Sequence, residues 1–525
     1  MIGRELKKMG PGWDEAIKNR AETILDAMGL DIVNETDWLL LTQTILSGKN
    51  GIYFTWLAIT GCYPNKYELR EFTSNLQIYG ERLTCLNLVS ERFKDVNYSK
   101  FLARVVLIKP KNSELVDVTH TSSVPFLTGI QRVVHGVTDD VAEISTFTWV
   151  GSSGILIERQ MSADNSKNSQ VDDKNSWRSR AIQTLHDLVP ILDRTPMGKR
   201  IRIAILPFAR KIKKALIKGE IKFVLDVGKS LEIQNILILN SRITIPEIPA
   251  PQHIFYYEAI MENSIVSTQV ILYDFIPLFH AWTVHPNNRG SLNLYLRIVL
   301  LADKIISISA LVQEQAQLIT RAFKLERTEW LLRKQTFDFL PLPSGLSSAS
   351  PEEFLKDAFL VVMAGSLEPR KNHIQFLDAL EILSDRNIPV KGEILGLAGW
   401  ENDHILDRIY ELQSKGVRIT RSSNLSDSVM RQRVGEAQVL LQISEAEGFG
   451  LPITEALALG TQVIVSDISP LKEWVGERVK SVKLGDAVEL ADLIAEILRS
   501  PETTTFPSKP EVSWSDWISL LYFTK

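Results

Sequence analysis

The chain contains 525 residues, of which 45% are hydrophobic and 23% are charged. This composition is typical of a folded globular protein and excludes a disordered, collagen-like or disulfide-scaffolded chain, and the length predicts about three domains. The net charge of −4 argues against nucleic acid as a main partner, and the presence of only two cysteines indicates a reducing compartment.

Residues 1–95 are predicted to form a helical N-terminal module, with helices over Asp14 to Leu30 and Asp37 to Leu46. No chemical motif occurs in this module, so we interpret it as a structural element or a site for a protein partner. The most apolar early stretch, Trp38 to Thr60, is interrupted by polar and glycine residues, and no secretory signal precedes it. We therefore expect a cytoplasmic protein.

From about residue 96, short β-branched runs alternate with helical segments. The expected strands are Glu114–Val118, Ser145–Val150, Arg242–Pro246, Gln269–Tyr273, Lys304–Ser309 and Trp330–Gln335. A polar stretch over 161–176 predicts a surface loop, and a Pro/Ser/Gly-rich segment over 341–351 predicts a linker.

A second alternating series follows the linker. Its expected strands are Phe359–Ala364, Gly392–Leu397, Val417–Thr420, Val439–Ile443 and Gln462–Ser466. Hydrophobic strands that alternate with helices are typical of parallel sheets covered on both faces. The sequence thus predicts an α/β protein with two doubly wound domains, whose ligands would bind at the carboxyl ends of the strands in the cleft between them.

The strongest local motif is Glu447-Gly-Phe-Gly-Leu-Pro-Ile-Thr-Glu455, which follows a predicted strand and leads into a short helix. Its glycines allow a ligand to approach the backbone, and the helix amides, with Thr454 as the expected cap, attract an anion such as phosphate. The two glutamates can accept hydrogen bonds from ribose or sugar hydroxyls. A glycine-rich turn with a capping glutamate is the alternative interpretation.

The second motif, Gly365-Ser-Leu-Glu-Pro-Arg-Lys-Asn-His373, ends a predicted strand and opens a helix. Two adjacent cations, Arg370 and Lys371, match a helix N-terminus poorly unless an anion lies there. A diphosphate would satisfy both, since arginine offers a fork of donors and lysine a point charge. In isolation, a solvated basic pair on a loop explains the motif equally well.

Taken together, VVMAGSLEPRKNHIQFLDAL and SEAEGFGLPITEALALGTQVIVSDISPLKEW resemble the C-terminal domain of the family 4 retaining glycosyltransferases, and in particular the mannosyl and hexosyl transferases of bacterial surface polysaccharides. The resemblance covers roughly residues 100–500 and is strong over 358–475. It implies the GT-B fold, two Rossmann-like domains facing across a cleft. Residues 96–345 would form the acceptor domain, 346–500 the nucleotide-sugar donor domain, and 501–525 a final helix that crosses back to the first domain.

The N-terminal half carries a weaker resemblance. The loop Thr128 to Val133 is similar to the family's first glycine loop, which implies that Gly129 and Ile130 lie against the donor diphosphate. Tyr273 to Pro277 resembles the loop beside the sugar-transfer centre, where many relatives have a histidine in place of Tyr273. Asp274 would either contact the donor or acceptor sugar or organise its loop as an Asx-turn residue.

The resemblance also implies roles for single residues of the second half. Arg370 and Lys371 would hold the donor phosphates and stabilise the leaving group, and Glu447 would contact hydroxyls of the transferred sugar. The remaining donor-binding positions are Glu455 on the ribose, backbone amides at Phe449, Gly450 and Leu451, and the loop 421–425 near the base, including Ser423 and Leu425. No D-x-D pair occurs in the sequence, which agrees with an enzyme that requires no metal and no other cofactor.

Residues 199–222 contain nine Lys or Arg and one acidic residue, with apolar residues at helical spacing. Such a helix either lies on an anionic membrane surface or is an ordinary surface helix whose apolar stripe faces the sheet. The first alternative would place the protein on the inner face of a membrane.

The function we expect is transfer of a hexose from a nucleotide diphosphate sugar to a hydroxyl acceptor, such as a surface polysaccharide or its lipid-linked precursor. A sugar phosphorylase or an epimerase is a rival of the same fold, but the lysine motif of the phosphorylase cofactor is missing. A catalytically silent sugar-nucleotide-binding partner of another transferase, docked through residues 1–95, is a rival of another class.

Overall fold

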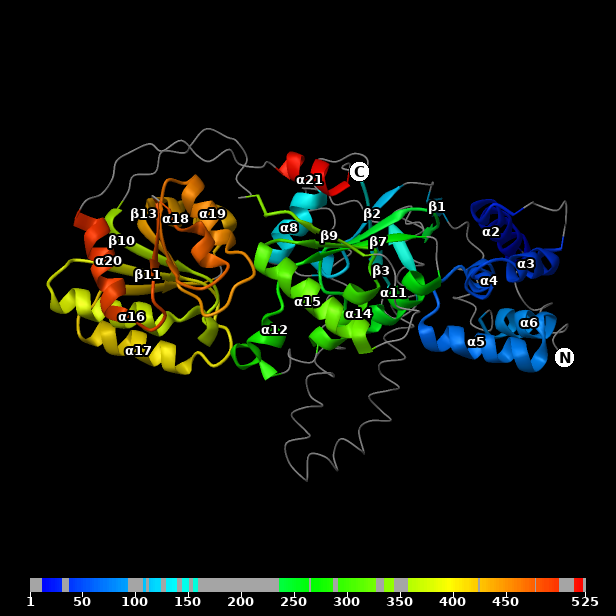
Figure 1. Ribbon diagram of the computed structural model, residues 1–525, viewed down its shortest axis with the longest axis horizontal. Coiled ribbons are helices and arrows are strands. Elements are labelled where there is room, and N and C mark those ends of the chain that lie inside the picture. The colour runs from blue at the N-terminus through cyan, green and yellow to red at the C-terminus, as the bar shows by residue number, and fades with distance from the viewer. Residues whose placement is uncertain are drawn as a thin grey trace, which may run out of the picture. The chain divides into compact units, whose positions relative to one another are not determined.

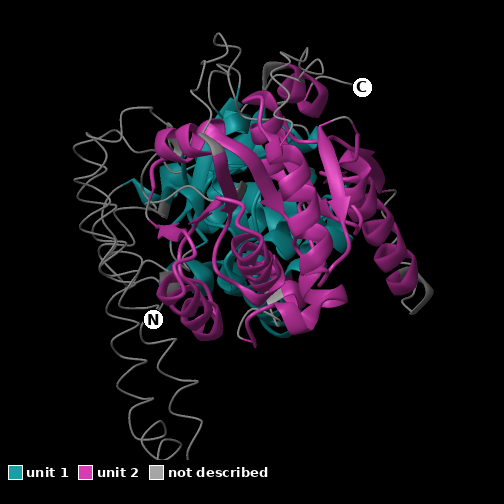
Figure 2. Ribbon diagram, turned by 90° about the vertical axis from the view of Figure 1, so that its left-hand side faces the viewer, with its two compact units in different colours: residues 1–270, 295–303 teal, residues 271–294, 304–525 magenta. Residues whose placement is uncertain are grey.

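The computed structural model describes most of the chain (Figure 1). The described residues are 12–30, 37–92, 107–109, 113–123, 129–138, 144–150, 154–158, 236–263, 266–286, 291–326, 335–343, 357–423, 425–476, 478–499 and 514–522. They form two compact units, one made of residues 1–270 with 295–303 and the other of 271–294 with 304–525 (Figure 2).

The first unit begins with a bundle of short helices. These are α2 (Trp13–Met28), α3 (Trp38–Ser47), α4 (Gly51–Thr60), α5 (Lys66–Tyr79) and α6 (Glu81–Arg92). Local signals fix several helix starts. The Asp37 side chain accepts a hydrogen bond from the N–H of Leu39, and Asn65 with Glu68 forms a reciprocal capping box at the start of α5.

The seven-stranded sheet has the order β4-β3-β2-β6-β7-β8-β9, in which β8 and β9 are assigned to the second unit and β7 is divided between the two. Its strands are β2 (Glu114–Asp117), β3 (Ile144–Trp149), β4 (Leu156–Glu158), β6 (Arg242–Ile245), β7 (Ser267–Leu272), β8 (Lys304–Ser307) and β9 (Thr336–Phe339). β3 and β4 pair antiparallel, whereas β2 pairs in parallel with β3 and with β6, β6 with β7, and β8 with β9. The helices of this region are α8 (Gly129–Thr138), α11 (Pro251–Asn263), α12 (Ile276–Phe279), α14 (Ser291–Leu301) and α15 (Ala310–Glu326), and a separate parallel pair joins β1 (Leu107–Lys109) to β5 (Ile236–Ile238).

The helical N-terminal region shares one core with this sheet. Buried residues of α4 and α6 lie in the same hydrophobic cluster as Val150 and Ile155. The N–H of Tyr63 donates to the carbonyl of Gly154 over 2.7 Å, and the hydroxyl of Tyr63 accepts from the N–H of Ile238 over 2.7 Å. Any side chain at position 154 would collide with the Tyr63 carbonyl. The helices are therefore packed into the first unit rather than appended to it.

The second unit contains a parallel six-stranded sheet in the order β12-β11-β10-β13-β14-β15. Its strands are β10 (Asp357–Ala364), β11 (Lys391–Leu395), β12 (Ile419–Ser422), β13 (Ala437–Gln442), β14 (Gln462–Ser466) and β15 (Val479–Val482). Its helices are α16 (His373–Asp385), α17 (Asp403–Ser414), α18 (Asp427–Glu436), α19 (Leu451–Ala458), α20 (Ala487–Arg499) and α21 (Trp514–Tyr522).

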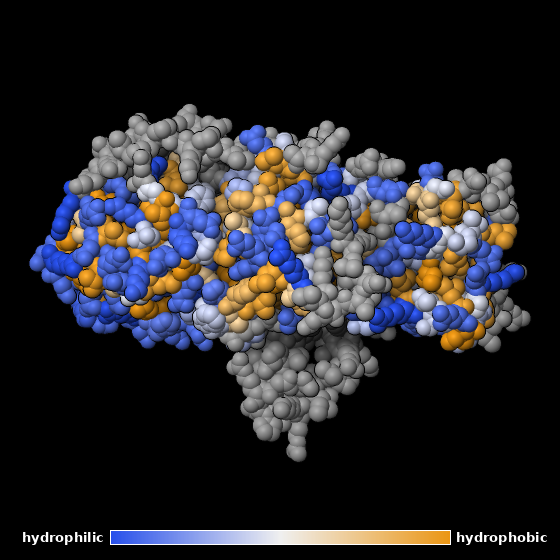
Figure 3. Space-filling view, in the orientation of Figure 1, coloured by the Kyte–Doolittle hydropathy of each residue, from blue (hydrophilic) through white to orange (hydrophobic). Residues whose placement is uncertain are grey.

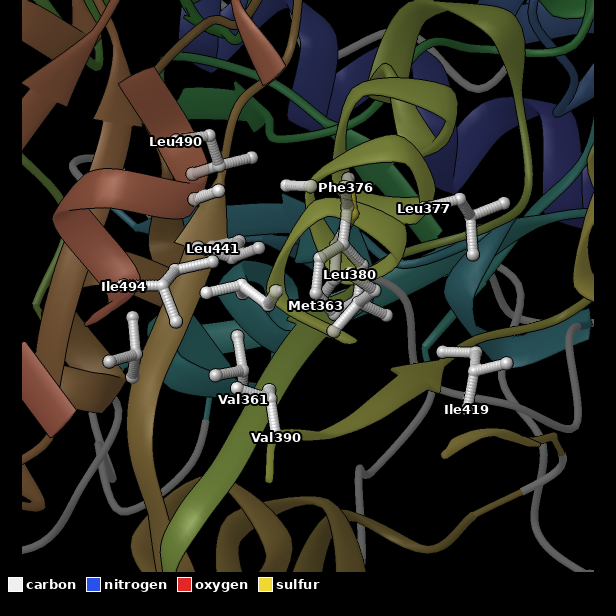
Figure 4. Close-up of a cluster of buried hydrophobic side chains, with 14 of the residues drawn as sticks. Val361, Met363, Phe376, Leu377, Leu380, Val390, Ile419, Leu441, Leu490 and Ile494 are labelled. Carbon is white, nitrogen blue, oxygen red and sulfur yellow. The ribbon is translucent and has the colours of Figure 1, made fainter. Parts of the chain in front are cut away.

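Both faces of this sheet are apolar, as the hydrophobic runs predict. Val361 and Met363 of β10 point to one face, where they pack against residues of α16 and α20 (Figure 4). Leu360 and Val362 point to the opposite face, in a second cluster with residues of α18 and α19. This alternation explains why β10 reads as a continuous apolar run rather than as an alternating one.

The two largely parallel sheets and the helical N-terminal region confirm the expected fold class. Most expected strands form within one or two residues of their predicted bounds. β1, β4, β5 and β15, which the sequence did not predict, have three or four residues each, too few for a periodicity to develop. Of the expected strand Trp330–Gln335 only Gln335 is described, and β9 begins directly after it.

Several sequence predictions concern residues outside the described segments. These are the surface loop over 161–176, the basic segment 199–222 and most of the linker over 341–351. Within the described segments, no helix combines the length and the apolar character needed to cross a membrane. Hydrophilic and hydrophobic residues are interspersed over the face shown in Figure 3.

The shared core of the first unit leads to a stability prediction. Tyr63→Phe removes the hydroxyl that accepts from Ile238, so a buried N–H loses its partner, at a cost of about 1–3 kcal/mol. We expect a lower midpoint in urea unfolding followed by circular dichroism. Tyr67→Phe, at an exposed ring in α5, is the matched control and should leave the midpoint unchanged. Equal midpoints for both variants would contradict the structural role of Tyr63.

Candidate functional site

The two sequence motifs of the second unit come together at the carboxyl ends of two strands of its sheet. β10 and β13 are neighbouring parallel strands, so their carboxyl ends lie side by side. Arg370 and Lys371 follow β10 in a short 3-10 turn, Pro369–Lys371, and Glu447 follows β13. The two cations thus precede α16, which begins only at His373.

Glu447 is the centre of a compact polar cluster. Its Oε1 lies 2.5 Å from Nζ of Lys371 and 3.1 Å from Nη1 of Arg370. The same oxygen accepts hydrogen bonds from the Ser444 hydroxyl at 2.7 Å and from the Gln442 amide at 2.8 Å. Arg370 also donates from Nη1 to the carbonyl of Ala446 at 2.6 Å. These contacts fix the carboxylate and both cations in one arrangement.

The cluster is mostly shielded from water, since the side chains of Lys371, Glu447 and Arg370 are 12%, 12% and 16% exposed. Burial alone would raise the pKa of Glu447, but the adjacent Lys371 and Arg370 lower it to about 2. Burial lowers the pKa of Lys371, whereas for Arg370 the opposing effect of Glu447 prevails and the pKa is raised. Glu447 is therefore ionised at neutral pH.

Gly365 accommodates the lysine. Its φ of +135° lies in the region that favours glycine, and a Cβ at this position would be 3.3 Å from Cε of Lys371. The glycine at the end of β10 thus lets the lysine side chain lie close over the backbone.

Asp274 belongs to the same unit and lies beside this cluster. A Cβ on Gly448 would be 2.1 Å from the carbonyl oxygen of Tyr273 and 3.2 Å from Cβ of Asp274, so only glycine permits the two loops to approach so closely. The Asp274 carboxylate accepts a hydrogen bond from the N–H of Ile276 at 2.9 Å. Burial raises the pKa of Asp274, an effect that this hydrogen bond and the charge of Arg370 oppose.

Asp274 therefore has the Asx-type role that the sequence allowed, and a contact with the reacting sugar stays a prediction. It caps its own loop as an Asx-type residue, and it lies within electrostatic reach of Arg370, Lys371 and Glu447.

The second half of the glycine motif forms the start of α19. Gly450, with φ +100°, is the N-cap, and Leu451 is the first helical residue. Phe449 is buried and its ring packs edge to face on Trp474, whose indole N–H donates to the Phe449 carbonyl at 3.3 Å. The expectation that Thr454 caps the helix is wrong, because Thr454 lies one turn inside and donates to the Leu451 carbonyl. Glu455 lies on the same helix, partly buried.

The other expected donor-binding residues lie on elements of both units. Gly129 and Ile130 begin α8 in the first unit, after β2. Ser423 follows β12 and is exposed, while Leu425 packs partly buried against the core near α18 and α19.

The sequence did not identify Gln442 and Ser444 as parts of the site. A polar residue ending the otherwise apolar strand Ala437–Gln442 is the signal that could have revealed Gln442. Ser444 has no comparable signal. In the segments described, no group of three or more His, Cys, Asp or Glu side chains is arranged to hold a metal ion.

Comparison with known proteins bears on the same region. Residues 348–509 match the family model of the glycosyl transferases group 1. The match spans the six-stranded sheet and both motifs, and it supports the resemblance to glycosyltransferases on which the motif assignments rest.

Among curated proteins, the serotype-specific mannosyltransferase WbdA of Escherichia coli is 28% identical over 229 residues, which are 41% of this chain and 28% of WbdA. The O-antigen chain mannosyltransferase B of Escherichia coli is 30% identical over 140 residues, 26% of this chain and 35% of that protein. The matched region thus spans about a third or less of these relatives. Among solved structures, Anabaena Alr3699/HepE in complex with UDP and glucose aligns over 78% of this chain and 95% of its own, with 14% identity and a TM-score of 0.43.

The buried ion cluster leads to a second stability prediction. Glu447→Gln leaves two shielded cations without their anion, and removing one partner of a buried pair costs about 3–5 kcal/mol. We expect a clear fall in melting temperature at pH 7. Glu445→Gln, at an exposed position two residues away, is the matched control and should melt like the wild type. Equal melting temperatures of Glu447→Gln and Glu445→Gln would contradict a stabilising role of the buried ion cluster.

The same carboxylate predicts a pH dependence. Because the pKa of Glu447 falls from 4.5 to about 2 on folding, its stabilisation is fully present above pH 4.5 and is lost as the pH falls towards 2. Glu447→Gln does not titrate, so the stability difference between wild type and variant should shrink across this window. Melting curves at several pH values measure it, and a constant difference would refute the assignment.

Proposed function

We propose that this protein is a retaining glycosyltransferase that moves a hexose from a nucleotide diphosphate sugar to a hydroxyl acceptor in bacterial surface polysaccharide or glycoconjugate synthesis. The observation that carries the proposal is the Lys371–Glu447–Arg370 cluster at the carboxyl edge of β10 and β13. It lies inside the segment that matches the glycosyl transferases group 1. Two relatives, WbdA and the O-antigen chain mannosyltransferase B, are mannosyltransferases, which favours mannose as the hexose.

The chemistry follows from the charges. Cleavage of the bond between sugar and diphosphate places negative charge on the departing oxygen. Arg370 and Lys371 are already fixed in place, so they would stabilise that charge without reorganisation and without a metal ion. Glu447, ionised and fixed by its donors, would accept hydrogen bonds from hydroxyls of the transferred sugar. Glu455 would hold the ribose, as the family resemblance implies.

The acceptor and the site of action belong to the same proposal. A growing surface polysaccharide or its lipid-linked precursor would bring the protein to the inner face of a membrane. The basic segment 199–222 is the candidate contact with that surface.

Lys371→Ala tests the diphosphate role directly. Loss of a charge-assisted contact of about 1.5–3 kcal/mol should weaken nucleoside diphosphate binding about 10- to 150-fold. Isothermal titration with UDP and with GDP measures the effect. Lys391→Ala is the control and should bind as the wild type does. Lys391 is the first residue of β11, so it lies at the amino end of a strand, whereas Arg370 and Lys371 follow the carboxyl end of β10. Unchanged affinity of Lys371→Ala would overturn the role.

Asp274→Asn separates catalysis from donor binding. The amide keeps an oxygen for the N–H of Ile276 but removes the charge beside the cluster. If Asp274 contacts the reacting sugar, kcat should fall at least tenfold while the dissociation constant of the nucleoside diphosphate stays within about twofold. If the kcat of Asp274→Asn equals that of the wild type, Asp274 has no role beyond its hydrogen bond within the loop.

A further inference from the structure

A cavity of the second unit lies at the amino ends of its strands. Its volume is about 530 Å³, and its lining includes Lys391, the first residue of β11, and Arg418, which directly precedes β12. The candidate site lies at the other end of the same sheet, since Arg370 and Lys371 follow the carboxyl end of β10. Pockets of about 300–1,000 Å³ hold small molecules. The cavity is therefore large enough for a small ligand and separate from the candidate site.

A buried ion pair forms one wall of the cavity. The Glu393 side chain, on β11, is 5% exposed, and its Oε2 accepts a hydrogen bond from Nε of Arg433 in α18 at 2.9 Å. The Oε1 of Glu393 accepts from the Ser422 hydroxyl at 2.7 Å, and Nη1 of Arg433 donates to Glu436 at 2.8 Å. These contacts hold the carboxylate and the guanidinium in place, so this wall is formed before any ligand binds.

The lining of the cavity carries an excess of positive charge. Among the described residues that line it, Lys391, Arg418 and Arg433 are cations and Glu393 is the one acid. Glu393 is already paired with Arg433. Arg418 is exposed, and its guanidinium makes no hydrogen bond or ion pair with the described part of the chain. The cavity therefore favours an anionic ligand, to which arginine offers a fork of donors.

Neutral polar groups lie beside these cations. Thr420 is the register partner of Glu393 in the β11–β12 pair, so the two side chains share one face of the sheet. Nε2 of Gln413 donates to the carbonyl of Ile419 at 2.8 Å, which leaves the amide oxygen of Gln413 as an acceptor. Thr420 and Gln413 are both exposed and both line the cavity. Hydroxyl and amide groups can exchange hydrogen bonds with the hydroxyls of a sugar.

We propose that this cavity binds a sugar phosphate, with Arg418 holding the phosphate and Gln413 and Thr420 contacting the sugar hydroxyls. A phosphate ion by itself would leave most of the volume empty, whereas a phosphorylated hexose supplies both the anion and the hydroxyls that the lining residues match. The site does not depend on the proposed function, because no residue of the Lys371–Glu447–Arg370 cluster lines the cavity.

Titration calorimetry with glucose 6-phosphate tests the site. The wild type should bind this probe saturably, and Arg418→Ala should bind it at least about tenfold more weakly, because a charge-assisted phosphate contact is lost. Arg418→Glu reverses the charge and should weaken binding further. Arg431→Ala, at an exposed position of α18 that does not line the cavity, is the matched control and should bind as the wild type does. Equal melting temperatures of the four proteins verify that the variants fold.

Further probes identify the ligand class. Glucose and inorganic phosphate should each bind at least about tenfold more weakly than glucose 6-phosphate, since each offers only one half of the contacts. Unchanged affinity in both Arg418 variants, no binding of glucose 6-phosphate by the wild type, or equally tight binding of inorganic phosphate would overturn the proposal. Displacement of glucose 6-phosphate by UDP or GDP would also overturn it, because the phosphate would then lie in the candidate site. Absence of nucleotide binding by the wild type would instead contradict the proposed function alone.

Discussion

The carboxylate of Glu447 is the constraint on which the candidate site depends. It lies between two cations that would repel each other in its absence, and a single oxygen receives four donors from Lys371, Arg370, Gln442 and Ser444. Such a cluster requires that residues far apart in the chain meet at fixed distances. The parallel pairing of β10 with β13 meets this requirement, since it brings both motifs to one edge of the sheet. The order of the strands in the second unit therefore determines which charged side chains come together in the candidate site.

A glycine also allows a further loop to approach the cluster. Gly448 lets the loop after β13 approach the loop that carries Asp274, so that a carboxylate from the end of β7 comes within reach of the cations. Residues 271–294 accordingly group with the C-terminal sheet in one compact unit, although β7 itself begins in the other. On the proposed function, such a site would hold the negative charge of a diphosphate and accept hydrogen bonds from sugar hydroxyls.

Much of this could be predicted from the sequence. Apolar runs and their spacing located most strands of both sheets, and the two motifs contain Arg370, Lys371 and Glu447, which the structure brings together. The periodicity of the sequence could not predict the tertiary contacts. The packing of residues 1–95 into the first unit depends on single contacts such as Tyr63 with Ile238, and nothing in the local pattern distinguishes a packed helix from an appended one. The position of Thr454 inside α19 depends on Gly450 taking the N-cap, a choice made by backbone conformation rather than by residue type.

On the proposed function, fixed cations at the carboxyl ends of β10 and β13 bind a nucleoside diphosphate. The most direct measurement is a thermal-shift titration of the intact protein with UDP, GDP, ADP, CMP and dTDP in EDTA, because a ligand that binds only the folded state raises the melting temperature by mass action. We expect one diphosphate to raise the melting temperature in a saturable manner without metal. No shift with any of them at millimolar concentration, or a shift only after magnesium is added, would contradict the claim.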